Sequence, residues 1–167
     1  MDIHIAPVFT FRDEASRKEL SEWREHIRAT KKLIFTNGVF DILHRGHVSY
    51  LLEARNLGDA LIIGVNADAS VRRLKGENRP IQSETDRAHI LASLKCADAI
   101  VIFDEDTPLE LITHVLPDVL VKGSDWDVSN VVGKDIVEAN GGKVLTLNFI
   151  EGRSTTSIVE SITTRYK

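Results

Sequence analysis

The chain has 167 residues, of which 43% are hydrophobic and 28% charged, and this describes an ordinary soluble globular chain long enough for one core. Its formal net charge of −4 argues against a general affinity for nucleic acid, because a phosphate backbone selects basic surfaces. The single cysteine, Cys96, excludes an intrachain disulfide, and no apolar run approaches the roughly 20 residues of a membrane-spanning helix.

The N-terminal region divides into an arm and a helix. Residues 1–15 show no clear hydrophobic period, whereas Leu20, Trp23 and Ile27 within 16–29 fall on one face of a helix. The start of the chain lacks the basic region and long apolar stretch of a signal peptide, so we expect a cytoplasmic protein. We treat residues 1–30 as an arm with a helix, and 31–167 as one domain.

Short apolar runs then alternate with amphipathic stretches. The runs are continuous rather than alternating, which is typical of strands buried on both faces of a parallel sheet. The predicted strands are 33–36, 60–66, 99–103, 118–123 and 143–148, and the predicted helices are 48–57, 84–95, 108–115, 133–140 and 155–165. This order predicts a single α/β domain with a doubly wound, mostly parallel five-stranded sheet.

The stretch TNGVFDILHRGH (36–47) lies at the carboxyl end of the first of these strands, where open α/β sheets bind ligands. Gly38 allows a tight turn at the end of the strand. Gly46 has no side chain and therefore allows a ligand to approach the backbone closely. His47 opens the next helix, whose first N–H groups are unpaired and favour an anion. We interpret this turn as a phosphate site with two added imidazole donors.

Other interpretations of the two histidines stay open on this stretch alone. One alternative is that they are zinc ligands, although the chain has no cysteine cluster and no HExxH motif. The other is that they are ordinary turn residues without a functional role. GxGxxG is absent, which argues against a dinucleotide-binding oxidoreductase, and GxxxxGK[ST] is absent, which argues against a P-loop enzyme.

Three further polar stretches follow other predicted strands. They are RLKGENRPI (73–81), VKGSDW (121–126) and EGRSTTS (151–157). In the last, Ser154 and the two threonines after it look like a helix N-cap, which is common, but a cap preceded by Gly-Arg also suits a polyphosphate.

Together these motifs resemble the HxGH nucleotidyltransferase superfamily, whose fold is a small Rossmann-like sheet, and within it the adenylyltransferase branch of ADP-heptose biosynthesis. The resemblance covers roughly residues 31 to 166, and EDTP (105–108) and NGGKVLTLNF belong to it. It implies that AMP passes from ATP to D-glycero-β-D-manno-heptose 1-phosphate, with Mg²⁺ accompanying ATP and no metal site built from protein ligands.

The resemblance also implies roles for individual residues. Cationic or donor groups that act in catalysis would be His44, His47, Lys122 and Arg153. Groups that hold the nucleotide would be Thr36, Asn37, Gly38, Phe40, Gly46, Gly123, Asp125, Ser154, Thr155 and Thr156. Groups that meet the sugar phosphate would be Asp41, Lys75, Arg79 and Arg87. Two alternatives remain: Arg87 as a surface helix charge, and Asp41 as a cap of its own turn.

The alternatives to this function are a cytidylyltransferase for glycerol 3-phosphate or another alcohol phosphate, and a non-catalytic nucleotide-binding sensor. The stretches RLKGENRPI and VKGSDW favour the heptose branch over the first. The complete histidine pair and RSTT favour an enzyme over the second. Many relatives carry a fused sugar kinase, for which 167 residues leave no room, so we expect the heptose kinase on a separate chain. Related enzymes form dimers, which suggests a homodimer.

Overall fold

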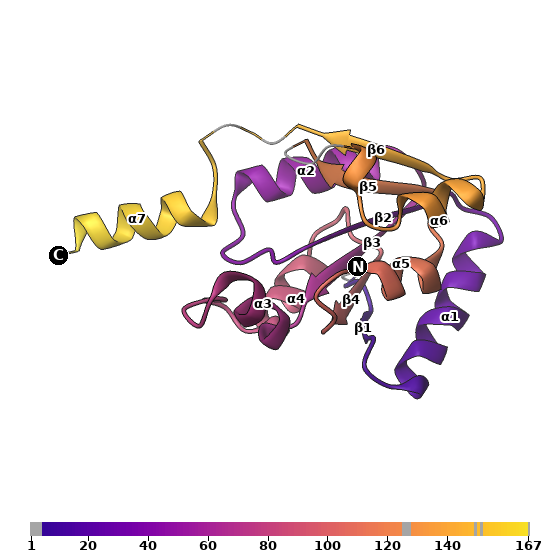
Figure 1. Cartoon of the computed structure of the whole chain (residues 1–167), viewed down its shortest axis with the longest axis horizontal. Helices are drawn as coiled ribbons and strands as arrows, with labels where there is room; N and C mark the ends of the chain where they lie inside the picture. The colour runs from indigo at the N-terminus through magenta and orange to yellow at the C-terminus, as the bar shows by residue number, and fades with distance from the viewer. Residues whose placement is uncertain (1–4, 125–127, 149, 151, 167) are drawn as a thin grey trace, which may run out of the picture.

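A computed structural model describes residues 5–124, 128–148, 150 and 152–166. Six strands in these ranges form one parallel sheet in the order β1-β4-β3-β2-β5-β6 (Figure 1). The strands are β1 (Val8–Thr10), β2 (Leu33–Gly38), β3 (Ala60–Asn66), β4 (Ala99–Phe103), β5 (Val119–Gly123) and β6 (Lys143–Leu147). The helices are α1 (Glu14–Arg28), α2 (Arg45–Arg55), α3 (Asp68–Lys75), α4 (Glu84–Ala92), α5 (Leu109–Val115), the 3₁₀ turn η1 (Val128–Asn130), α6 (Lys134–Ala139) and α7 (Thr155–Arg165).

The predicted parallel α/β sheet is confirmed, but the predicted strand number of five is wrong. The additional strand, β1, lies in the segment interpreted as an arm and pairs with β4, where Val8 is opposite Ile100. This strand has only three residues and sits at the edge of the sheet, with Val8 exposed. Such a short, half-exposed strand carries no continuous apolar run, which is why the pattern missed it. A domain boundary at residue 30 stays a prediction.

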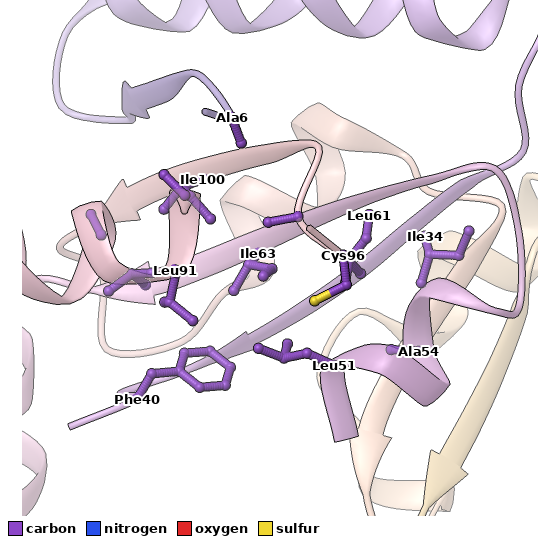
Figure 2. Close-up of a cluster of buried hydrophobic side chains, with 14 of the residues drawn as sticks. Ala6, Ile34, Phe40, Leu51, Ala54, Leu61, Ile63, Leu91, Cys96 and Ile100 are labelled. Carbon is purple, nitrogen blue, oxygen red and sulfur yellow. The ribbon is translucent and has the colours of Figure 1, made fainter. Parts of the chain in front are cut away.

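Helices cover both faces of the sheet and bury two apolar clusters. One cluster joins residues of β2, β3 and β4 to α2 and α4, and includes Leu51, Leu91 and Cys96 (Figure 2). The other joins the opposite face of the same strands to α1, α5 and α6, through Leu20, Leu111 and others. Cys96 is 5% exposed and burial raises the pKa of its thiol, so it is a core residue.

Two helices differ from the sequence prediction. Helix α3 was not predicted, and the stretch RLKGENRPI (73–81) begins within it, so that Lys75 ends a helix. Helix α2 begins at Arg45 with His44 as its N-cap, three residues earlier than predicted. The last helix, α7, projects away from the rest of the chain (Figure 1). No helix among the described residues is long and apolar enough to cross a membrane.

Strand β2 is the switch point of the sheet. Its two neighbours are β3, which follows it along the chain, and β5, which is reached only after the chain has built β4 on the other side. Helices that leave in opposite directions open a crevice at the carboxyl ends of such a pair. The fold therefore places the end of β2, and the loop that follows it, where a ligand is expected.

Candidate active site

The loop between β2 and α2 is held in an unusual backbone conformation. Phe40 and Ile42 have φ angles of 51° and 50°, a left-handed region that costs a side-chain-bearing residue, and a β-branched one most. The ring of Phe40 is only 7% exposed, and it passes so close to Gly38 that a Cβ there would lie 3.1 Å from the ring. Glycine at 38 therefore makes room for the ring that anchors the loop.

Asp41, between these two residues, ties three segments together. Its carboxylate is fully buried and accepts hydrogen bonds from Ile81 N (2.9 Å), Gln82 N (3.0 Å) and Arg79 Nε (2.8 Å). Its backbone oxygen accepts a 2.5 Å hydrogen bond from the hydroxyl of Thr155, at the start of α7. A carboxylate with three donors inside the protein is a structural anchor, so a direct contact with sugar hydroxyls has no support in this geometry.

Arg87 is also an internal connector. It is 1% exposed and donates to the backbone oxygens of Val39, Gln82 and Asn66 and to the carboxylate of Asp68. The alternative of a surface helix charge is therefore wrong. A guanidinium with four internal acceptors has no free face for a phosphate either, so the geometry argues against the predicted substrate contact.

The two histidines of the loop form a stacked pair at the first turn of α2. Their ring centroids lie 3.8 Å apart with 20° between the planes, and the ring of Phe40 meets His47 edge-on at 5.4 Å. The Nδ1 atoms of both are buried without a hydrogen-bond partner among the described residues. His44, as N-cap, makes no side-chain capping bond, so the first N–H groups of α2 stay available to an anion.

Burial favours the neutral form of both imidazoles. Burial, followed by the nearby charge of Arg153, lowers the pKa of His44. Burial, with a smaller contribution from His44, lowers the pKa of His47 to about 4, although Asp41 opposes this. A phosphate bound here would oppose both effects, because a negative charge favours the imidazolium form.

The start of α7 lies against this histidine pair. A Cβ on Gly46 would sit 3.0 Å from the ring of His44 and 3.3 Å from Cβ of Arg153, so glycine at this position permits the approach of both. Ser154 accepts a hydrogen bond from Ser157 N and caps the helix, as the capping interpretation predicted. Thr155 is buried against Asp41, whereas Arg153 and Thr156 are exposed.

A cavity of about 390 Å³ opens at the carboxyl ends of β2, β3 and β5. Asn37 and Gly38 of β2 and Lys122 of β5 line it, and the ammonium of Lys122 donates a hydrogen bond to Oδ1 of Asn37. Lys75, at the end of α3, reaches the same cavity. His44, His47 and Arg153 do not line it, so the predicted residues divide into two groups: a histidine cluster (His44, His47, Arg153) and the residues of this cavity.

The remaining predicted residues have varied positions. Thr36 is fully buried, with its hydroxyl 2.7 Å from that of Tyr50, and is therefore shielded from a triphosphate. Gly123 is buried at the end of β5, and Asp125 lies outside the described residues. Arg79 is bound to Asp41 and does not line the cavity.

Several residues of the cavity were absent from the predicted site. Asn66 ends β3, and Asp106 and Thr107 follow β4, so the rule that ligands bind at carboxyl ends of parallel strands would have found all three. The positive φ angles of Phe40 and Ile42 have no signal in the sequence, since neither is a glycine.

The lowered pKa of His47 predicts a dependence of stability on pH. As the pH falls from about 6.5 to about 4, protons bind this imidazole in the unfolded chain but not in the folded one, so the fold loses stability. The loss approaches about 1.4 kcal/mol per pH unit for one such group. Urea unfolding of the wild type and of His47→Gln at pH 7.5 and 5 should show a larger loss in the wild type. Equal losses would contradict a neutral, desolvated His47.

Among the described residues, no group of three or more His, Cys, Asp and Glu side chains is arranged to hold a metal ion. Asp104, Glu105 and Asp106 are consecutive, but Arg73 pairs with the first and the last of them.

Comparisons with known proteins place these motifs in context. Residues 35–160 match the family described as Cytidylyltransferase-like. The chain is 59% identical over 143 residues to the "Bifunctional protein HldE" of Citrifermentans bemidjiense, which covers 86% of this chain and 29% of that protein. It is 59% identical over 140 residues to the protein of the same name from Syntrophotalea carbinolica, covering 84% and 29%. The chain thus spans about 29% of the length of these curated relatives.

Two solved structures have similar folds. One is the "lipopolysaccharide core biosynthesis protein" of Thermoplasma volcanium, with a TM-score of 0.61 and 30% identity, covering 74% of this chain and 99% of that one. The other is the pantoate-beta-alanine ligase of Francisella tularensis, with a TM-score of 0.61 and 16% identity, covering 92% and 76%. The second likeness concerns the fold alone.

Proposed function

From the premise that this chain belongs to the Cytidylyltransferase-like family, we propose that it joins AMP from ATP to D-glycero-β-D-manno-heptose 1-phosphate, giving ADP-heptose and pyrophosphate. The colinear motifs RLKGENRPI, VKGSDW and EGRSTTS, which resemble the heptose branch, support this choice of acceptor. The name of the Thermoplasma volcanium relative, a lipopolysaccharide core biosynthesis protein, agrees with a product that feeds the inner core of lipopolysaccharide.

The observation that carries the proposal is the histidine pair at the first turn of α2, with Arg153 packed against Gly46 beside it. Three kinds of phosphate donor meet there: imidazole N–H groups, a guanidinium, and the free N–H groups of a helix start. The carboxylate of Asp41, within the same loop, is occupied by its own hydrogen-bond donors. Such a site suits a polyanion.

In the proposed reaction an oxygen of the sugar phosphate forms a bond to the α-phosphorus of ATP. The bond from that phosphorus to the bridging oxygen breaks, and pyrophosphate leaves with the electron pair. The nucleophile is already ionised at neutral pH, because the second pKa of a phosphate monoester is about 6. No general base is therefore needed, and neutral histidines are compatible with the reaction.

Catalysis then rests on charge and position. His44 and His47 donate N–H groups to the α- and β-phosphates as negative charge builds on the leaving pyrophosphate. Arg153, with the start of α7 behind it, binds the outer phosphates, and Thr155 couples this helix to the histidine loop through Asp41. Magnesium bound to ATP would neutralise part of the triphosphate charge, with phosphate oxygens and water as its ligands.

Three further statements belong to the proposal. We place the enzyme in the cytoplasm, where ATP is available, and expect it to act as a homodimer. A separate heptose kinase would supply its substrate, although the HldE relatives are named bifunctional. The homodimer and the separate heptose kinase stay predictions.

A substrate panel tests the function. Pyrophosphate release should be robust with ATP, Mg²⁺ and the β-manno heptose 1-phosphate, and should stop when the metal is chelated. A pocket that hydrogen-bonds several hydroxyls rejects acceptors that lack them, so glycerol 3-phosphate and choline phosphate should give little. Efficient turnover of CTP with glycerol 3-phosphate, and none with ATP and the heptose phosphate, would favour the cytidylyltransferase alternative instead.

A further inference from the structure

Building on this proposed function, we propose that the cavity beside the β2 end is the sugar subsite and that Asp106 and Thr107 bind the sugar hydroxyls. The volume of about 390 Å³ lies within the range of about 300–1,000 Å³ that is usual for small-molecule sites. The cavity and the histidine cluster adjoin opposite parts of one loop, which suits two substrates that meet at the carboxyl end of β2.

The phosphate end of this subsite is marked by its cations. Of Lys75, Arg79 and Arg87, which were all predicted to meet the sugar phosphate, only Lys75 lines the cavity. Its ammonium forms no ion pair with a described residue, whereas the two arginines are bound to Asp41 and Asp68. Lys122 adds a second cation, which Asn37 orients. Two lysines that line one cavity suit a phosphate dianion.

The hydroxyl end lies in the loop after β4. Oδ1 of Asp106 accepts a 2.7 Å hydrogen bond from Nε of Arg73, which leaves Oδ2 for a ligand. The ion pair fixes the carboxylate and offsets its charge, so that it can accept hydrogen bonds from hydroxyls without repelling a nearby phosphate. The hydroxyl of Thr107 has no partner among the described residues and lines the same wall.

The apolar part of the wall fits the carbon skeleton of a sugar. Leu74 is 49% exposed although it is large and apolar, and it lines the cavity together with Pro108 and Val131. A sugar presents C–H groups on its ring faces and hydroxyls at its rim, so it can contact such a wall and the polar loop at once. A bound sugar would cover the exposed Leu74 in a cavity that Lys75 and Lys122 also line.

The test uses Asp106→Ala and Thr107→Val, with Asp104→Asn as the matched control. Asp104 also contacts Arg73, at 3.5 Å, but does not line the cavity. The KM for heptose 1-phosphate, and its Kd measured by calorimetry without ATP, should rise about tenfold in Asp106→Ala, since a hydrogen bond to a charged group contributes about that much, and about threefold to tenfold in Thr107→Val, whose hydrogen bond is neutral. The KM for ATP should change less than twofold, and the control should match the wild type.

A second pair, Lys75→Ala against Arg72→Ala, examines the phosphate end. Arg72 is an exposed cation of the same helix that does not line the cavity. Lys75→Ala should weaken binding of heptose 1-phosphate about tenfold and Arg72→Ala should not.

If Asp106→Ala and Thr107→Val behave like Asp104→Asn while the wild type turns over heptose 1-phosphate, the sugar subsite is wrong and the proposed function stands. If the wild type neither binds nor uses heptose 1-phosphate, both fail.

Discussion

Replacing His47 with alanine should lower the turnover number of pyrophosphate release by about a hundred- to a thousandfold, the usual cost of losing one preorganised donor to a developing negative charge. His44→Ala should have an effect of similar size, because the rings stack 3.8 Å apart and share one helix start. The KM values should change much less than kcat, because the donors act most strongly as the bond to pyrophosphate breaks. Steady-state kinetics with each substrate varied would measure this.

The matched control is His26→Ala, at an exposed position on α1. It should leave turnover unchanged, and circular dichroism should show that all three variants are folded. A folded His47→Ala or His44→Ala enzyme with more than half of the wild-type activity would remove the histidines from catalysis. Unfolding of both variants would support the interpretation as ordinary turn residues.

Arg87→Ala should destabilise the fold by about 3–5 kcal/mol, the usual loss when one partner of a buried ion pair is removed. The side chain is fully buried and its four acceptors would be left without their donor. Three of these acceptors lie in the histidine loop, at the end of β3 and before α4, so the loss should spread to the whole site. Urea unfolding followed by circular dichroism gives the free energy of unfolding directly.

Two comparisons sharpen this result. Arg72→Ala removes an exposed arginine and should change the free energy of unfolding by no more than about 0.5 kcal/mol. Arg87→Lys keeps the charge but lacks the planar fork of donors, so its stability should fall between the wild type and Arg87→Ala. A stable Arg87→Ala protein with a raised KM for the sugar phosphate would instead restore the predicted substrate contact.

The sequence pattern predicted the central sheet well because its strands are long and buried on both faces. Strands β3 and β4 match the predicted ranges 60–66 and 99–103, and the family prediction is confirmed. The pattern failed for β1, whose three residues are half exposed, and for α3, whose eight residues include the charged run RRLK. Both elements are too short to show a hydrophobic periodicity that distinguishes them from turns.

Within the site, sequence motifs located the loops but did not assign roles to their polar residues. Asp41 and Arg79 look like ligand-binding residues because they are charged and lie in glycine-containing motifs, and the family resemblance implied the same for Arg87. The Arg79–Asp41 bond and the contact of Arg87 with Val39 join segments that are far apart in the sequence and meet only in the fold. Conversely, Thr107 and Asn66 carry no charge and had no predicted role, although Thr107 lies in EDTP (105–108), and the alignment of strand ends brings both to the cavity.

The central claim is attack on the α-phosphorus of ATP by a sugar phosphate, and the position of an isotopic label tests it most directly. The wild-type enzyme, Mg²⁺ and heptose 1-phosphate would be incubated with ATP carrying ³²P at either the α- or the γ-position, and the products separated. We predict that the α-label appears in ADP-heptose and the γ-label in pyrophosphate. Transfer of the γ-label to the sugar, or no incorporation of the α-label into a sugar nucleotide, would contradict this account.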